Sequence, residues 1–203
     1  MTSALLALLL AATPAASAKG AARPIAQTDP VATVREAERQ VRAAFRAGGK
    51  RAELERIGAA TIDYEELARR SVGPRWAKLS PADRSAIVKS LRALVEETWL
   101  SGLLRPDPLF AFAVLGKQVT GTEAEVKTRV QSGGRQAPVD FRLVRGKDGR
   151  FRVIDVTVNG VSALGGYREQ FPQLLDLGGV PLLLETLAIQ RRALVEMRTP
   201  RRP

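Results

Sequence analysis

The side chains that could do chemistry in this chain are few in kind, because its 203 residues include no cysteine and no histidine. Disulfides, thiol nucleophiles, zinc sites built on Cys or His and every catalytic triad that depends on His are therefore excluded. Carboxylates, Lys, Arg, Tyr and hydroxyl groups remain. We expect no bound metal and no cofactor.

Asp155 is the acidic residue that stands inside a strongly apolar segment, residues 151–158. A buried carboxylate has a raised pKa and can act as a general base. An isomerase or hydratase with a cone-shaped fold of the nuclear-transport-factor-like class could use Asp155 in this way. Alternatively, Asp155 hydrogen-bonds a neighbouring strand or turn, or lies at the open edge of a sheet. We favour this structural role, because the sequence places no second titratable partner beside it.

Two further candidates for a catalytic or binding role follow Asp155 along the chain. Ser162 lacks the context of a nucleophile elbow and has no His to activate it, so we do not expect a hydrolase. Gly165 and Gly166 could hold a phosphate at the start of a helix. Their spacing fits neither a Walker loop nor a dinucleotide fingerprint, so a turn is the better interpretation.

The segment 151–158 must itself be a β-strand, because it is rich in Val, Ile and Phe. Apolar residues occur on both of its faces, which predicts a central strand covered on both sides. Asn159-Gly160 favours a turn after it, since both residues tolerate positive φ. At period two, one face carries Ile154, Val156 and Val158, and the other carries Phe151, Val153, Asp155 and Thr157.

The rest of the chain changes its hydrophobic period once, from helical to alternating and then back to helical. Helices are expected first, antiparallel strands next and a C-terminal helix last, which indicates the α+β class. Such a sheet can curve around helices packed on one face and enclose an apolar cavity. We predict helices at 30–47, 51–57, 63–72 and 80–102, strands at 109–115, 122–130, 139–144 and 151–158, and helical segments at 174–177 and 181–195.

The two ends of the chain differ in composition from the domain between them. Residues 1–18 resemble a secretory signal peptide, because a short apolar run is followed by the cleavage pattern Ala16-Ser17-Ala18. We expect 19–28 to be a flexible arm, 29–197 a single exported domain and 198–203 a basic tail. The net charge of +11 favours anionic partners such as nucleic acid, anionic lipid or an acidic protein surface. The export signal argues against nucleic acid.

The stretch 151–171 also carries a family resemblance. Ile154-Asp155-Val156, Gly160-Val161-Ser162 and Tyr167-Arg168-x-Gln170-Phe171 resemble the signature of the MlaC family. These are the periplasmic phospholipid shuttles of the Mla lipid-asymmetry pathway, also called the toluene-tolerance family. Weaker matches occur at 63–68, at Gly73-x-x-Trp76 and at 123–130.

The resemblance implies a non-enzymatic, monomeric periplasmic carrier whose lipid-binding domain is 29–197. Such a carrier holds the acyl chains of a phospholipid in an apolar cavity between sheet and helices. It passes lipid between an outer-membrane lipoprotein complex and an inner-membrane ABC transporter with its substrate-binding membrane protein. The residues expected to line the cavity or its rim are Trp99, Phe112, Val126, Phe141, Ile154, Val156, Val161, Leu164 and Tyr167.

Overall fold

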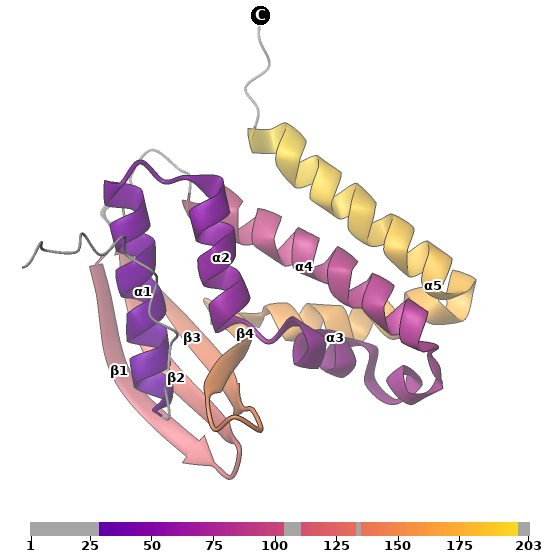
Figure 1. The fold of residues 1–203 in the computed structure, drawn as a ribbon, viewed down its shortest axis with the longest axis horizontal. Coiled ribbons are helices and arrows are strands. Elements are labelled where there is room, and N and C mark those ends of the chain that lie inside the picture. Colours follow the sequence, from indigo (N-terminus) through magenta and orange to yellow (C-terminus); the bar gives the residue numbers. More distant parts are fainter. Residues whose placement is uncertain (1–28, 104–110, 133–134, 199–203) are drawn as a thin grey trace, which may run out of the picture.

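The computed structural model describes residues 29–103, 111–132 and 135–198. The expected signal peptide at 1–18, the expected arm at 19–28 and residues 199–203 of the expected tail lie outside these ranges. In the described part, helices come first, an antiparallel sheet follows and a broken helix comes last (Figure 1). This order confirms the predicted α+β class.

Three of the first four α-helices begin where a polar side chain satisfies free backbone N–H groups. Asp29 and Asp63 each accept a hydrogen bond from an N–H in the following turn, at 3.3 and 2.9 Å. Ser80 Oγ accepts one from the N–H of Asp83 at 3.1 Å. The predicted helices at 30–47, 63–72 and 80–102 begin at these residues or directly after them. The elements are α1 (Pro30–Arg46), α2 (Arg51–Thr61), α3 (Tyr64–Val72), the 3-10 helix η1 (Gly73–Lys78) and α4 (Pro81–Leu103).

The sheet has five strands, each hydrogen-bonded to the next one along the chain. Its first strand runs further than the predicted 109–115, because a bulge after Val114 lets the pairing continue to Thr120. The third strand likewise begins before the predicted residue 139. The strands are β1 (Ala111–Thr120), β2 (Glu123–Ser132), β3 (Arg135–Arg145), β4 (Phe151–Val158) and β5 (Val161–Ser162).

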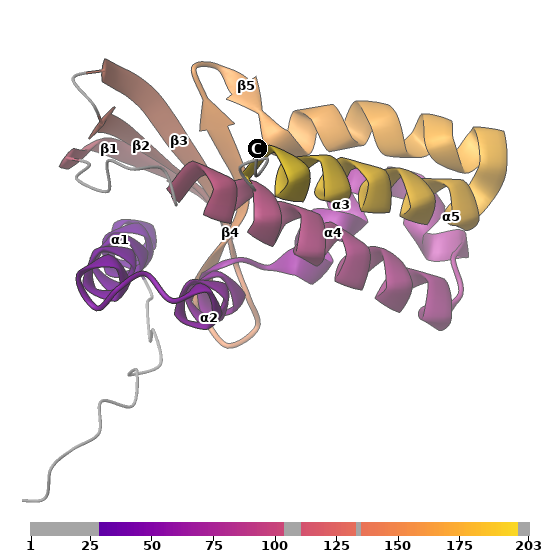
Figure 2. The ribbon, with the colours of Figure 1, turned by 90° about the horizontal axis from the view of Figure 1, so that it is seen from above.

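The described chain packs around two main apolar cores. In one, α1 lies across a face of the sheet and contacts β1, β2 and β4 (Figure 2). In the other, α3, α4 and α5 pack on one another beyond the end of the sheet. The buried residues of the sheet core are Val34, Ala124, Val126, Leu143, Phe151 and Val153. Those of the helical core are Leu67, Ala68, Val72, Ile87, Leu91, Leu94, Leu164, Phe171, Leu183 and Leu187.

The last helix, α5 (Ala163–Arg198), begins earlier than the predicted segments and is broken at Gly178 and Gly179. By length and composition, it is the one helix among the described residues that could cross a membrane. The break instead folds the chain back. Leu164 from the first half and Leu183 from the second meet in the helical core.

Candidate functional site

One face of the sheet gathers apolar side chains from four strands. Alternate residues of β1 to β4 point to the same face, since the period of a strand is two. Four of the predicted lining residues meet there in and around the sheet core: Phe112, Val126, Phe141 and Val156. The Phe112 and Phe141 rings lie 6.4 Å apart, tilted by 59°. This face is the candidate site.

The candidate site is closed at one end and less covered at the other. Near the β3–β4 turn, α1 lies over it, and the Thr33 hydroxyl donates to the carbonyl of Phe151 at 3.4 Å. Leu143 and Phe151, at this end of the sheet, are accordingly buried. Toward the other end Phe141 and Val156 are half-buried, and Val158 is 43 % exposed. An apolar surface that its own chain covers only in part can accept an apolar ligand.

The β4 residues that lie on this face are not the ones expected from the sequence. Ile154 and Asp155 together oppose Arg142, so the strand carries a bulge there. The extra residue resets the alternation, and Phe151 and Val153 share the face of Val156. The expectation that Phe151 and Val153 lie opposite Val156 was therefore wrong. Ile154 is buried but is not part of the sheet core.

The remaining predicted lining residues are not gathered at the sheet face. Leu164 is buried in the helical core, and the Tyr167 ring packs 5.2 Å from that of Phe171. Val161 is 75 % exposed, in the short strand β5 after the β4 turn. Trp99 belongs to the last turns of α4, and its side chain lies outside the described part of the chain.

Asp155 lies under the start of α5 and is only 6 % exposed. Its carboxylate accepts hydrogen bonds from the Ser162 hydroxyl at 2.6 Å and from the N–H of Leu164 at 2.9 Å. Ser162 Oγ in turn accepts from the N–H of Gly165 at 2.8 Å, which makes Ser162 the N-cap of α5. Burial, and then the charge of Asp155, raises the pKa of Tyr167. Both Asp155 oxygens thus have the structural partners that we favoured from the sequence.

The described residues contain no group of three His, Asp or Glu side chains placed to hold a metal ion. The sheet face is likewise lined by hydrocarbon rather than by ligating atoms. Its chemistry is therefore burial of apolar surface, which contributes about 25 cal/mol for each Å² removed from water.

A family model described as MlaC protein matches residues 31–188, most of the chain. The chain belongs to the MlaC family. The resemblance seen in its sequence is thereby confirmed.

A solved structure similar to this MlaC-family protein is the phospholipid-binding protein from Ralstonia solanacearum in complex with a phospholipid. The two chains are 20% identical and superpose with a TM-score of 0.71, over 81% of this chain and 97% of that one. At this identity the likeness concerns the fold. No curated protein matches the chain.

Phe151 and Val153 are members of the candidate face that the sequence pattern did not predict. Nothing in the residues around them signals a bulge, because Ile154 and Asp155 also fit a regular strand. Val158, by contrast, was on the expected face but was not chosen as a lining residue. Val158 follows Val156 by two residues in the strand, and this spacing could have predicted that both line the same face.

Proposed function

We propose that this MlaC-family protein is a periplasmic phospholipid carrier. It holds acyl chains against the apolar sheet face, and it moves lipid between an outer-membrane lipoprotein complex and an inner-membrane ABC transporter complex. The observation that carries the proposal is the partly covered apolar face in a chain of this family. The phospholipid bound to the structurally similar Ralstonia protein supports the same ligand.

In this proposal the acyl chains lie against Phe112, Phe141 and Val156 and leave the protein past Val158. Each CH₂ group removed from water contributes about 0.8 kcal/mol, so long chains are held firmly without a covalent bond. The release needed by a carrier then comes from a docked partner that offers the chains another apolar site. Contacts of Trp99, Ile154, Val161, Leu164 and Tyr167 with lipid stay predictions.

The alternative, an isomerase or hydratase that uses Asp155 as a general base, has less support. Both oxygens of Asp155 already accept hydrogen bonds from Ser162 and Leu164. A base in this position would first have to leave the cap of α5.

The first test is to extract the purified protein with organic solvent and identify the extract by mass spectrometry. We expect phospholipid at a fixed ratio to protein after expression in a Gram-negative host. Protein that carries no lipid, and that takes none up from liposomes, would refute the proposal.

A pair of variants tests the position of the site. Val158→Asp puts a charge at the less covered end of the face, and we expect the co-purified lipid to fall several-fold, because a carboxylate near acyl chains loses its hydration. Leu115→Asp is the matched control: Leu115 is 56 % exposed, at the bulge of the edge strand β1 and outside the sheet core. Circular dichroism should show both variants folded. Equal amounts of co-purified lipid in the two variants would contradict the assignment of the lipid site to this face.

A further inference from the structure

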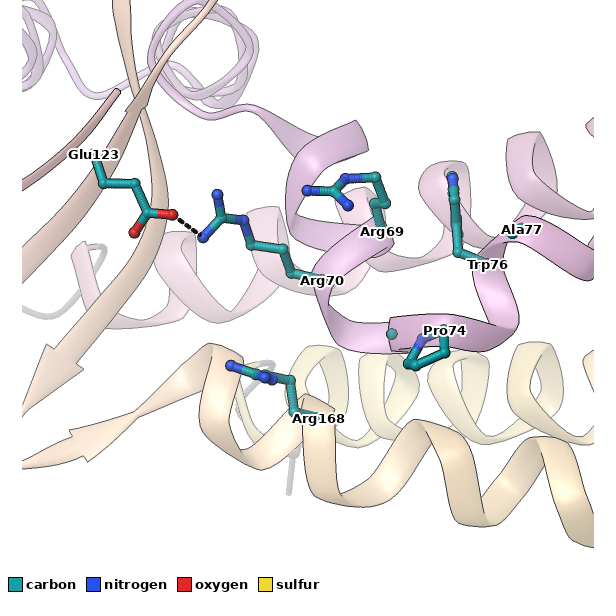
Figure 3. Close-up of a pocket in the computed structure, with 8 residues that line it drawn as sticks. Arg69, Arg70, Pro74, Trp76, Ala77, Glu123 and Arg168 are labelled. Carbon is teal, nitrogen blue, oxygen red and sulfur yellow. Dashed lines mark hydrogen bonds and ion pairs between the residues drawn. The ribbon is translucent and has the colours of Figure 1, made fainter. Parts of the chain in front are cut away.

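A hollow separate from the candidate sheet face lies in the helical half of the molecule. It has a volume of about 560 Å³ and is formed by the end of α3, by η1, by the start of β2 and by the first turns of α5 (Figure 3). None of the residues that line it belongs to the sheet core. We call it the arginine hollow after its main lining residues, which are Arg69, Arg70, Trp76, Glu123 and Arg168.

Two of these arginines are already engaged by carboxylates. Arg69 donates two hydrogen bonds to Glu66, both at 2.6 Å. Arg70 bridges two elements, because it donates to Glu66 at 2.7 Å and to Glu123 at 2.8 Å. These bonds lower the pKa of Glu66, and Arg69 is the larger cause. The Glu66 carboxylate therefore stays negative at neutral pH. The three arginines that line the hollow face two carboxylates, Glu66 and Glu123, so one positive charge is left without a partner.

That charge is on Arg168. Its side chain is exposed and makes no hydrogen bond or ion pair with the side chains that the structure describes. Arg70 and Arg168 extend toward the end of the hollow that Glu123 occupies (Figure 3). A further cation stands behind Trp76, because the Arg84 guanidinium lies 5.8 Å from the centre of the Trp76 ring. Arg84 donates to the carbonyls of Trp76 and Ala77 rather than to a carboxylate.

We propose that the arginine hollow binds a phosphate-type oxyanion. A planar guanidinium presents parallel N–H donors that match two oxygens of one phosphate group, and Arg168 has all its donors available. The indole of Trp76 supplies an apolar wall for the organic part of a phosphate ester. The proposal does not depend on the lipid carrier function, because it concerns other residues in another core.

Glu123 has a defined part in this site. Its side chain is 45% exposed and holds Arg70 from the rim. A bound phosphate would compete with Glu123 for the Arg70 donors. Removing the Glu123 charge should therefore strengthen the binding of the anion, whereas removing the Arg168 charge should weaken it.

The test is a titration of the purified protein with inorganic phosphate, followed by isothermal calorimetry. We expect saturable binding that Arg168→Gln weakens about tenfold, as expected for a lost charged hydrogen bond, and that Glu123→Gln tightens. The matched control is Arg191→Gln, which removes the same charge from an exposed position of the same helix, outside the hollow. It should leave the affinity within about twofold, since the charge of an exposed side chain outside the hollow is screened by salt. No saturable binding, or an equal loss with Arg168→Gln and Arg191→Gln, would overturn the proposal.

Co-sedimentation with vesicles then distinguishes the two sources of such a group. If the natural ligand is the headgroup of an anionic lipid in a membrane, phosphatidylglycerol vesicles should bind the wild-type protein and the Arg191→Gln variant more than Arg168→Gln. If the ligand is a free phosphate compound, vesicle binding should not distinguish these variants, while phosphate binding still does. Either result supports the oxyanion site. If the purified protein carries no lipid, the carrier proposal fails, but the proposal of an oxyanion site does not.

Discussion

At the scale of single residues, Asp155 shows how a buried carboxylate can serve the fold. The first turn of a helix has N–H groups without partners inside the helix. In α5, Asp155 and Ser162 supply acceptors for two of these, at Leu164 and Gly165. The positive end of the helix dipole also favours a negative charge at this point. The acid that suggested catalysis therefore joins β4 to α5.

Asp155→Asn should reduce the free energy of unfolding by about 1–3 kcal/mol, because a buried hydrogen bond to a charged group is lost. Ser162→Ala should have a smaller effect, about 1 kcal/mol, as for other N-caps. Urea unfolding followed by circular dichroism measures both. In the double variant the effects should not add, since the two side chains share one network.

The co-purified lipid separates the two roles of Asp155. A carrier with Asp155→Asn should keep its lipid, whereas an enzyme would lose turnover. A variant of unchanged stability would contradict the capping role.

At the scale of elements, the break in α5 decides how the helical core is filled. Gly179 has a φ of 66°, in the left-handed region, and a Cβ on Gly178 would lie 2.7 Å from the Cβ of Leu182. Glycine at both positions lets the second half turn back so that Leu183 and Leu187 join Phe171.

Gly179→Ala should lower the free energy of unfolding by about 1–2 kcal/mol, because the left-handed conformation is costly for a residue with a Cβ. Gly166→Ala is the control: this glycine is in the helical first half, has no strained φ, and its added Cβ meets nothing within 4 Å. It should be neutral or stabilising by up to about 1 kcal/mol. Thermal unfolding of the two variants tests this, and equal destabilisation would contradict it.

The bulges of the sheet act at the same scale. In β1 the pairing shifts between Val114 and Gly116, and in β4 it shifts at Ile154. Each bulge increases the local twist and changes which side chains reach the candidate face of the sheet. Because of the second bulge, Phe151 and Val153 lie beside Val156 under α1.

At the scale of the whole molecule, the two cores have different degrees of closure. The helical core is closed by the packing of α3, α4 and α5 on one another. The sheet core is buried below α1 but only half covered toward Val158. We expect a ligand to stabilise the protein through the sheet core, since that is where apolar surface is left to cover.

Removal of co-purified lipid should therefore lower the melting temperature. A ligand present at about 100 times its Kd stabilises the native state by about 2.7 kcal/mol, which corresponds to about 5–10 °C for a chain of this size. Differential scanning calorimetry before and after delipidation measures the shift. Val158→Asp should show a smaller shift than Leu115→Asp, and an unchanged melting temperature after delipidation would count against a lipid site.

The sequence by itself determined the α+β order, the helix starts at Asp29, Asp63 and Ser80, and the resemblance to the MlaC family. Caps, turns and hydrophobic periods depend on residues close together in the chain, so they can be recognised there. Only the tertiary structure decided that Leu164 and Tyr167 belong to the helical core, while Phe151 and Val153 face α1. These placements depend on strand register and on contacts between distant segments, for which a local pattern carries no signal. The arginine hollow has the same origin, because Arg70, Glu123 and Arg168 meet only after α3, β2 and α5 have packed.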